Sequence, residues 1–114
     1  SFGAAADFGY QIREKSKGPS KVMILDFSQV PFLDVSAARA VQTIAEDGKV
    51  SNKLVYISGM TDQIRNMLTD LMGEIVPGEQ YFDSRRDAIA AAVEFVESTE
   101  ADPSGGAHTE PPPA

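Results

Sequence analysis

The sequence predicts an α/β fold, in which a sheet of about three to five parallel or mixed strands packs against helices. Two apolar runs, Val22–Phe27 and Leu54–Ser58, lack the alternation of a half-buried strand, which is typical of strands covered on both faces. Each run is followed by a segment with helical periodicity. The resulting order of strand, helix, strand, helix, short strand and helix indicates parallel strands joined by right-handed crossovers.

The first segment is expected to be a helix over Ala4–Lys15, because its apolar residues recur at spacings of three and four. Gly18 and Pro19 should end it. The residues before this helix read as the end of a strand. We therefore expect the opening strands of the sheet to precede Ser1.

Two amphipathic helices follow the apolar strands. One is predicted over Val35–Asp47, with Gly48 in the left-handed position that ends many helices. The other should begin at a cap formed by Thr61 or Asp62 and end at Met72. Their expected inner faces consist of Ala37, Ala38, Val41, Ile44 and Ala45, and of Ile64, Met67, Leu68, Leu71 and Met72.

The last elements are a short edge strand and a helix. Pro77 marks a turn before the strand Tyr81–Phe82, and Asp83 or Ser84 should cap a helix that runs to about Val96. The residues expected to face inward from this helix are Ile89, Val93 and Val96.

Residues 99–114 contain Pro, Gly, Ser and Glu but no large apolar side chain. Burial there cannot offset the conformational entropy of ordering, so we expect a disordered acidic tail. The folded domain is predicted to span residues 1–98. The tail carries Glu100, Asp102 and Glu110 and no Lys or Arg, which assigns to it three of the seven net negative charges.

Composition excludes several classes of function. A net charge of -7 and a single adjacent basic pair in the folded part, Arg85 and Arg86, argue against nucleic acid as a partner. The chain has no Cys, and its one His, His108, lies in the expected tail. General acid–base, nucleophilic and metal chemistry need such residues in a rigid site. We therefore expect no enzyme, no metal site and no required cofactor.

The segment Lys21–Gln42 holds the residues best placed for recognition. Asp34 is expected to cap the following helix, which would stabilise it by about 1 kcal/mol. Ser36 should lie in the first turn, where a phosphate would meet favourable helix N–H groups but also the charge of Asp34. Phe32 is either an exposed knuckle or packs onto the adjacent helix. A purely structural role and a role in partner contact, with phosphorylation at Ser36, both fit these residues.

The turn after the second strand is a weaker candidate site. Ser58, Gly59 and Thr61 follow a strand and open a helix, which would offer at most a weak contact for an anion or a nucleotide. Ordinary turn formation accounts equally for these residue types.

Several segments of the chain resemble one known family. They are FGAA at Phe2–Ala5, ILDFSQVPFLDVSAARAV at Ile24–Val41, ISGM at Ile57–Met60 and YFDSRRDAIAAAVEFV at Tyr81–Val96. Together they resemble the STAS domain, the fold shared by bacterial anti-sigma-factor antagonists and the cytoplasmic tails of SulP anion transporters. The resemblance covers Phe2 to about Val96, and its second segment is the most specific.

The resemblance is closer to the transporter group. In free-standing antagonists, two hydroxyl residues and a Gly follow the signature Asp, and a partner kinase phosphorylates a hydroxyl. Here Val35 and Ala37 stand at the first hydroxyl and at the Gly, and only Ser36 remains. The resemblance therefore implies a non-enzymatic regulatory domain on the cytoplasmic side of a membrane transporter for sulfate, bicarbonate or a dicarboxylate.

The resemblance also implies the kind of partner. We expect the remainder of the transporter, a second STAS protomer in a homodimer or a regulatory protein, with Phe32, Asp34 and Ser36 as contact residues. The alternative is a free-standing anti-sigma-factor antagonist that is switched by phosphorylation of Ser36.

Overall fold

The computed structural model describes residues 20–101 of the 114-residue chain. The predicted helix at 4–15, the strand end before it and residues 102–114 of the predicted tail lie outside this range. The described elements are β1 (Val22–Asp26), α2 (Val35–Val50), β2 (Leu54–Ser58), α3 (Asp62–Met72), the 3₁₀ turn η1 (Gly78–Gln80), β3 (Tyr81–Phe82) and α4 (Arg85–Ala101). Their order confirms the predicted alternation of strands and helices.

The described strands form one parallel sheet in the order β1-β2-β3. Leu25 lies opposite Ile57, and Ile57 lies opposite Tyr81, so the three strands end at the same edge. Backbone bonds extend the pairing beyond the strands, because the N–H of Phe27 donates to Ser58 at 2.8 Å and that of Gly59 donates to Phe82 at 3.0 Å. The parallel arrangement confirms the predicted fold class.

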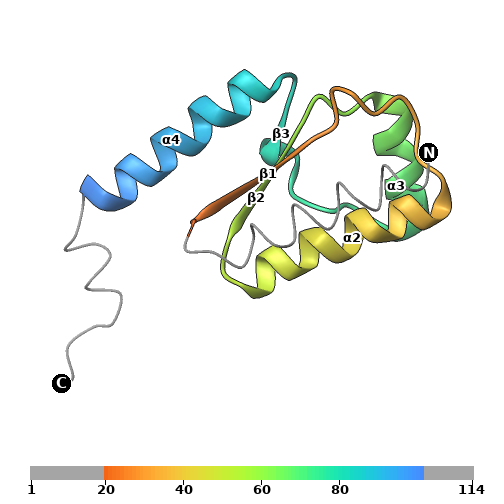
Figure 1. The fold of residues 1–114 in the computed structure, drawn as a ribbon, viewed down its shortest axis with the longest axis horizontal. Coiled ribbons are helices and arrows are strands. Elements are labelled where there is room, and N and C mark those ends of the chain that lie inside the picture. Colours follow the sequence, from red (N-terminus) through yellow and green to blue (C-terminus); the bar gives the residue numbers. More distant parts are fainter. Residues whose placement is uncertain (1–19, 102–114) are drawn as a thin grey trace.

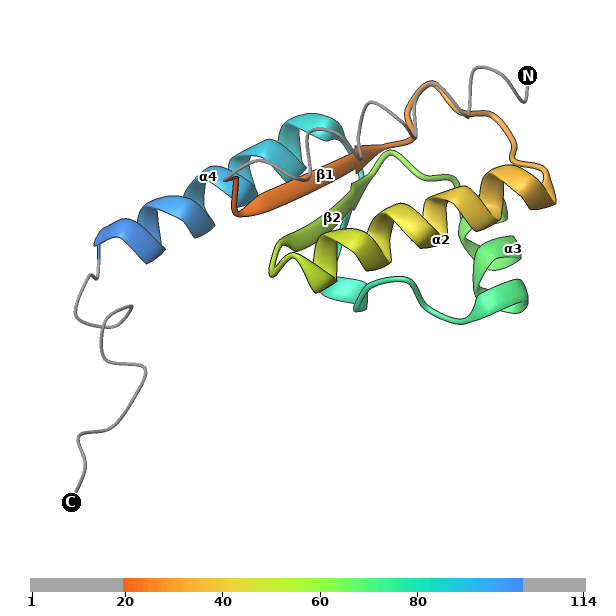
Figure 2. The ribbon, with the colours of Figure 1, turned by 60° about the horizontal axis from the view of Figure 1, so that its bottom comes forward.

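Helices cover both faces of this small sheet. Figure 1 shows α2 and α3 on one side of β1 and β2, and α4 on the other side. Figure 2 shows α2 running alongside the two longer strands, and α4 contacts all three strands. This layering explains why the strands lack polar alternation, since neither face of β2 is left to water.

The main core lies between the sheet and the α2–α3 layer. Its residues from the strands and the position just after β1 are Met23, Leu25, Phe27, Val55 and Ile57, and its helix residues include Ala38, Val41, Ile44, Ala45, Ile64 and Leu68. All five residues predicted for the inner face of α2 are buried. On the other sheet face, Tyr56 lies against Phe82 with ring centroids 4.8 Å apart, and Ala88 of α4 is completely buried.

Gly48 is not the left-handed residue after a helix, so that prediction was wrong. It lies inside α2, which continues to Val50, and the left-handed residue is Asn52 with φ 62°. A side chain at Gly48 would place Cβ 2.6 Å from the end of Met23 and 3.0 Å from a methyl group of Val55. The glycine therefore leaves room for Met23 and Val55 beneath α2 rather than ending the helix.

Helix α3 begins and ends where predicted. The hydroxyl of Thr61 accepts from the N–H of Ile64 at 3.2 Å, and Gly73 follows the helix with φ 81°. The prediction was wrong for Leu71, whose side chain is 49% exposed. It belongs to the last turn of α3, at the gap between this helix and α2.

Helix α4 is longer than predicted. It continues to Ala101, so the first three residues of the predicted tail, 99–101, are helical. Two of the residues expected to face inward, Ile89 and Val93, are 39% and 48% exposed, whereas Val96 is half-buried. A 17-residue helix is about 25 Å long, whereas a five-residue strand is about 17 Å long. The helix α4 therefore extends beyond the sheet on which it packs.

Candidate functional site

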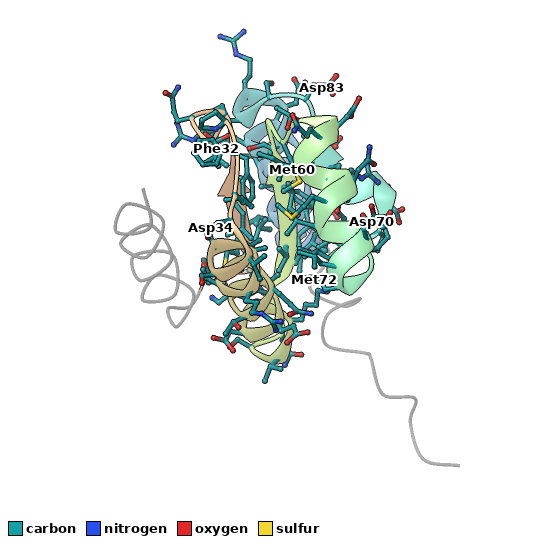
Figure 3. The ribbon with its side chains drawn as sticks, turned by 90° about the vertical axis from the view of Figure 1, so that its right-hand side faces the viewer. Phe32, Asp34, Met60, Asp70, Met72 and Asp83 are labelled. Atoms are coloured by element: carbon teal, nitrogen blue, oxygen red, sulfur yellow. The ribbon has the colours of Figure 1, made fainter. Side chains whose placement is uncertain are left out.

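The carboxyl ends of the three parallel strands meet at one edge, where open α/β sheets commonly bind their ligands. The loop from β1 to α2 leaves this edge at Phe27, and the turn from β2 to α3 leaves it at Gly59. Figure 3 shows the side chains of this region, with Phe32, Met60 and Asp83 toward the same end of the molecule.

Asp26 joins the two loops through its carboxylate. It accepts from the hydroxyl of Ser58 at 2.8 Å and from the hydroxyl of Ser28 at 2.7 Å. Burial by itself raises the pKa of the Asp26 carboxyl, but the hydrogen bonds from Ser28 and Ser58 and the positive charge of Arg85 outweigh it, so the pKa lies below its ordinary value of 3.8. Asp26 therefore remains ionised, and its hydrogen bond with Ser58 links the carboxyl ends of β1 and β2.

The stability of the domain should therefore contain an acid-sensitive contribution from Asp26. Because the folded pKa lies below the unfolded value of 3.8, this contribution is complete above that pH and is lost as the pH falls through the folded pKa. We expect Asp26→Asn to be less stable than the parent at neutral pH and to converge on it as the pH falls below 3.8 and through the folded pKa. Melting temperatures measured across this range check the prediction, and a constant difference at every pH would contradict it.

Gly59 brings the two loops into backbone contact. Its φ is +67°, and a Cβ there would lie 3.0 Å from the backbone nitrogen of Ser28 and 3.1 Å from its Cα. A left-handed residue without a side chain is thus required for the β2–α3 turn to pack against the β1–α2 loop. This contact and the Asp26 carboxylate together fix where the loop begins.

The three residues predicted to contact a partner all lie on the surface. Phe32 is 71% exposed, so it is a knuckle and does not pack onto the helix. Asp34 and Ser36 are also exposed, with Ser36 as the second residue of α2. Figure 3 shows Phe32 toward the top of the loop and Asp34 below it, at the start of this helix. Their function as partner contacts stays a prediction.

Asp34 caps α2, as the sequence predicts, because its carboxylate accepts from the N–H of Ala37 at 2.8 Å. Asp34→Ala should lower the free energy of unfolding by about 1 kcal/mol through loss of this cap. Asp34→Asn retains a capping oxygen and should lose much less. Chemical denaturation of the three proteins checks the effect, and an unchanged Asp34→Ala midpoint would show that the cap contributes nothing.

The groups predicted to offer a weak anion contact are engaged within the protein. The side chain of Ser58 is fully buried and donates to Asp26, the N–H of Gly59 donates to Phe82, and the hydroxyl of Thr61 caps α3. Each of these three residues of the turn therefore has a structural role that accounts for its presence.

A groove between α2 and α3 was not found by sequence reasoning. It has a volume of about 330 Å³ and is lined by Val35, Arg39, Gln42, Leu71 and Met72. Helical periodicity predicted that Leu71 faces the core, so this pattern did not indicate an exposed groove there. The sequence feature that could have indicated the groove is Val35, an apolar residue in the otherwise polar first turn of a helix. In the structure it is 52% exposed.

Within residues 20–101, no three His, Cys, Asp or Glu side chains gather in a way that would hold a metal ion. Of the helices described there, none combines the length and apolar character required to cross a membrane.

Comparison with known proteins agrees with this geometry. The STAS domain family model matches residues 1–88, which include the strands β1, β2 and β3 of the described range, α2, α3 and the start of α4. The bicarbonate transporter BicA of Synechocystis sp. (strain ATCC 27184 / PCC 6803 / Kazusa) is 33% identical over 72 residues, which make up 62% of this chain and 13% of the transporter. Since the family match covers most of the sequence and the parallel sheet with helices on both faces fits it, the chain belongs to the STAS domain family.

Proposed function

We propose that this chain is the regulatory domain of a SulP-type anion transporter and acts by protein–protein contact on the cytoplasmic side of the membrane. The similarity to a bicarbonate transporter supports the assignment to transporters and favours it over the free-standing antagonist. The observation that carries the contact mechanism is Phe32, whose aromatic ring is 71% exposed on a loop held at its base.

Because Phe32 is exposed, the favourable free energy of burying its side chain can still be gained when a partner binds. Burying a Phe side chain is worth about 1.5–3 kcal/mol, and this stabilisation is not used in the chain itself. The base of the loop is fixed, because Phe27 is buried in the core and its carbonyl accepts from the N–H of Val30 at 3.0 Å. Little conformational entropy of the loop would therefore be lost when a partner binds at this end of it.

Ser36 is the residue of this surface at which a regulatory modification would act. It is exposed in the first turn of α2, and a phosphate there would add nearly two negative charges beside Asp34. In the proposed mechanism, this change of charge alters which partner the surface accepts. The partner is the rest of the transporter, a second copy of this domain or a regulatory protein.

The proposed domain is not an enzyme and needs no cofactor. The carboxylate of Asp26, at the carboxyl end of β1, accepts hydrogen bonds from Ser28 and Ser58. Because the pKa of this carboxylate lies below its ordinary value, Asp26 is a weak base and does not activate either hydroxyl as a nucleophile.

The test uses the full-length transporter with Phe32→Ala. We expect altered uptake of labelled bicarbonate, sulfate or dicarboxylate at an unchanged amount of protein in the membrane. Phe95→Ala is the matched control, because Phe95 is 38% exposed on α4, away from the proposed surface. Normal uptake by Phe32→Ala, or an equal defect in Phe95→Ala, would contradict the proposed contact.

Ser36→Ala and Ser36→Glu test the switch in the same assay. We expect opposite effects on uptake if a negative charge at this position regulates the domain, together with phosphate on Ser36 detected by mass spectrometry of the native protein. Equal behaviour of both variants, with no phosphate found, would contradict regulation at Ser36.

A further inference from the structure

We infer that Arg39 is the residue that binds a phosphate group on Ser36, through an ion pair across the first two turns of α2. The inference rests on the proposed function, because it names the group that receives the modification proposed there. It adds that this pairing offsets the one charge carried by the described residues that line the groove between α2 and α3. Three observations support it.

The first observation is the spacing of the two residues on α2. Ser36 and Arg39 are three positions apart near the start of the helix, and both are exposed. Residues at this spacing are neighbours on one helix face, with Cβ atoms about 5–6 Å apart. A phosphate on the Ser36 Oγ would therefore lie within reach of the long Arg39 side chain without any change in the backbone.

The second observation is that Arg39 has no acidic neighbour on its own helix. The residues three and four positions away from it are Val35, Ser36, Gln42 and Thr43. None of them carries a charge. Among the residues that the structure describes, Arg39 forms no ion pair. Its guanidinium is therefore available to an anion that appears on the same face.

Other cations of residues 20–101 are already engaged in holding the fold. The ammonium group of Lys49 donates to the carbonyl of Ile75. The guanidinium of Arg65 lies 3.6 Å from the carboxylate of Glu74 and 3.7 Å from the ring centre of a tyrosine. Turning either group toward a new anion would break these contacts, whereas turning Arg39 breaks none.

The third observation is the state of the Ser36 hydroxyl. Thr61 uses its hydroxyl to cap α3, and Thr43 donates its own to the carbonyl of Arg39 at 3.1 Å. In α2 the carboxylate of Asp34 forms the cap, so Ser36 is not needed for it. The Ser36 hydroxyl makes no hydrogen bond within the described part of the chain. Its modification would therefore cost no existing contact.

The balance of charge gives Arg39 its role. A protein kinase would transfer the γ-phosphoryl group of ATP to the Ser36 Oγ, with release of ADP and of the hydroxyl proton. The product carries nearly two negative charges, two residues after the carboxylate of Asp34. Arg39 is the only basic residue in 34–42, so it supplies the nearest opposite charge on the helix. A guanidinium can bind a phosphate through two parallel N–H···O bonds.

The pairing would be felt beyond α2, because Arg39 also lines the groove of about 330 Å³ between the two helices. Leu71 and Met72 line the same groove from the end of α3. When a phosphate on Ser36 binds Arg39, the positive charge of this groove is offset. A modification at the start of α2 therefore changes the charge of a surface that is shared with α3.

The test is a phosphorus NMR titration of the purified chain with phosphoserine placed at position 36 during translation, so that no kinase is required. The second pKa of a phosphoserine is ordinarily about 6 and responds to nearby charges. In Arg39→Gln we expect this pKa to lie about 0.3 pH unit or more above its value in the phosphorylated parent. The difference should shrink as salt rises from about 0.05 to 0.5 M.

Two further variants assign the effect to Arg39. Arg86→Gln is the matched control, because it removes the same charge from an exposed position on α4, and it should leave the phosphate pKa nearly unchanged. Arg39→Lys keeps the positive charge and should restore most of the difference. The replaced side chains are exposed, so these variants should fold, which circular dichroism checks.

The same phosphate pKa in Arg39→Gln and the parent would overturn the inference. An equal change in Arg86→Gln would also overturn it, since the effect would then come from net charge alone. Native protein without phosphate on Ser36 would contradict the proposed regulation, but the ion pair would still be measurable in the phosphoserine protein. The two proposals therefore fail separately.

Discussion

Replacing Phe27 with alanine should lower the free energy of unfolding by about 3–5 kcal/mol, the range for removing a large aromatic side chain from a packed core. Phe27 is 2% exposed and belongs to the cluster between the sheet and helices α2 and α3. It is also the first residue after β1, and its N–H donates to the carbonyl of Ser58 at 2.8 Å. The cavity would therefore open directly under the loop that carries Phe32.

The matched control is Phe32→Ala, which removes the same side chain from a surface position. Because Phe32 is 71% exposed, this variant should change stability by less than about 0.5 kcal/mol. Urea denaturation followed by circular dichroism measures both effects. If the two variants were destabilised equally, Phe32 would have to be packed in solution, and its role as an exposed contact would be wrong.

Gly59→Ala should be destabilised by about 2–4 kcal/mol, because strain and steric overlap add at this position. An alanine at φ +67° lies in the left-handed region that side chains disfavour, and its Cβ would lie 3.0 Å from both the nitrogen and the Cβ of Ser28. All three atoms nearest the new Cβ, the N, Cα and Cβ, belong to Ser28, whose hydroxyl donates to Asp26 at the base of the loop. Relief of the overlap would thus move the loop itself.

Two other glycines separate these causes. Gly73→Ala has nothing within 4 Å of the new Cβ, but its φ of 81° and ψ of -179° lie in a region almost confined to glycine, so it measures backbone strain without overlap. Gly78→Ala would meet only Arg65 at 3.7 Å, an ordinary contact, and should be close to neutral. Thermal denaturation of the three variants checks the order. A Gly59→Ala protein as stable as Gly78→Ala would contradict the close contact between the two loops.

The candidate site was only partly predictable. The exposed cap at Asp34 and the position of Ser36 follow from local chemistry, since capping depends on residues three positions apart. The bond from Ser58 to Asp26 joins residues 32 positions apart, and neither residue type by itself predicts it. The groove at Leu71 was concealed for the same reason. Periodicity gives the face of a helix, but it does not tell whether a neighbouring helix reaches that face.

The amino-acid sequence alone determined the parallel α/β order and the positions of β1, β2 and α3. These features depend on runs of apolar residues and on caps such as Thr61, which act over a few neighbouring positions. Only the tertiary structure decided that Gly48 serves helix–sheet packing, that Leu71 faces a groove and that α4 extends beyond the sheet. The physical reason is that burial depends on the lengths and separations of distant elements, which no local pattern contains.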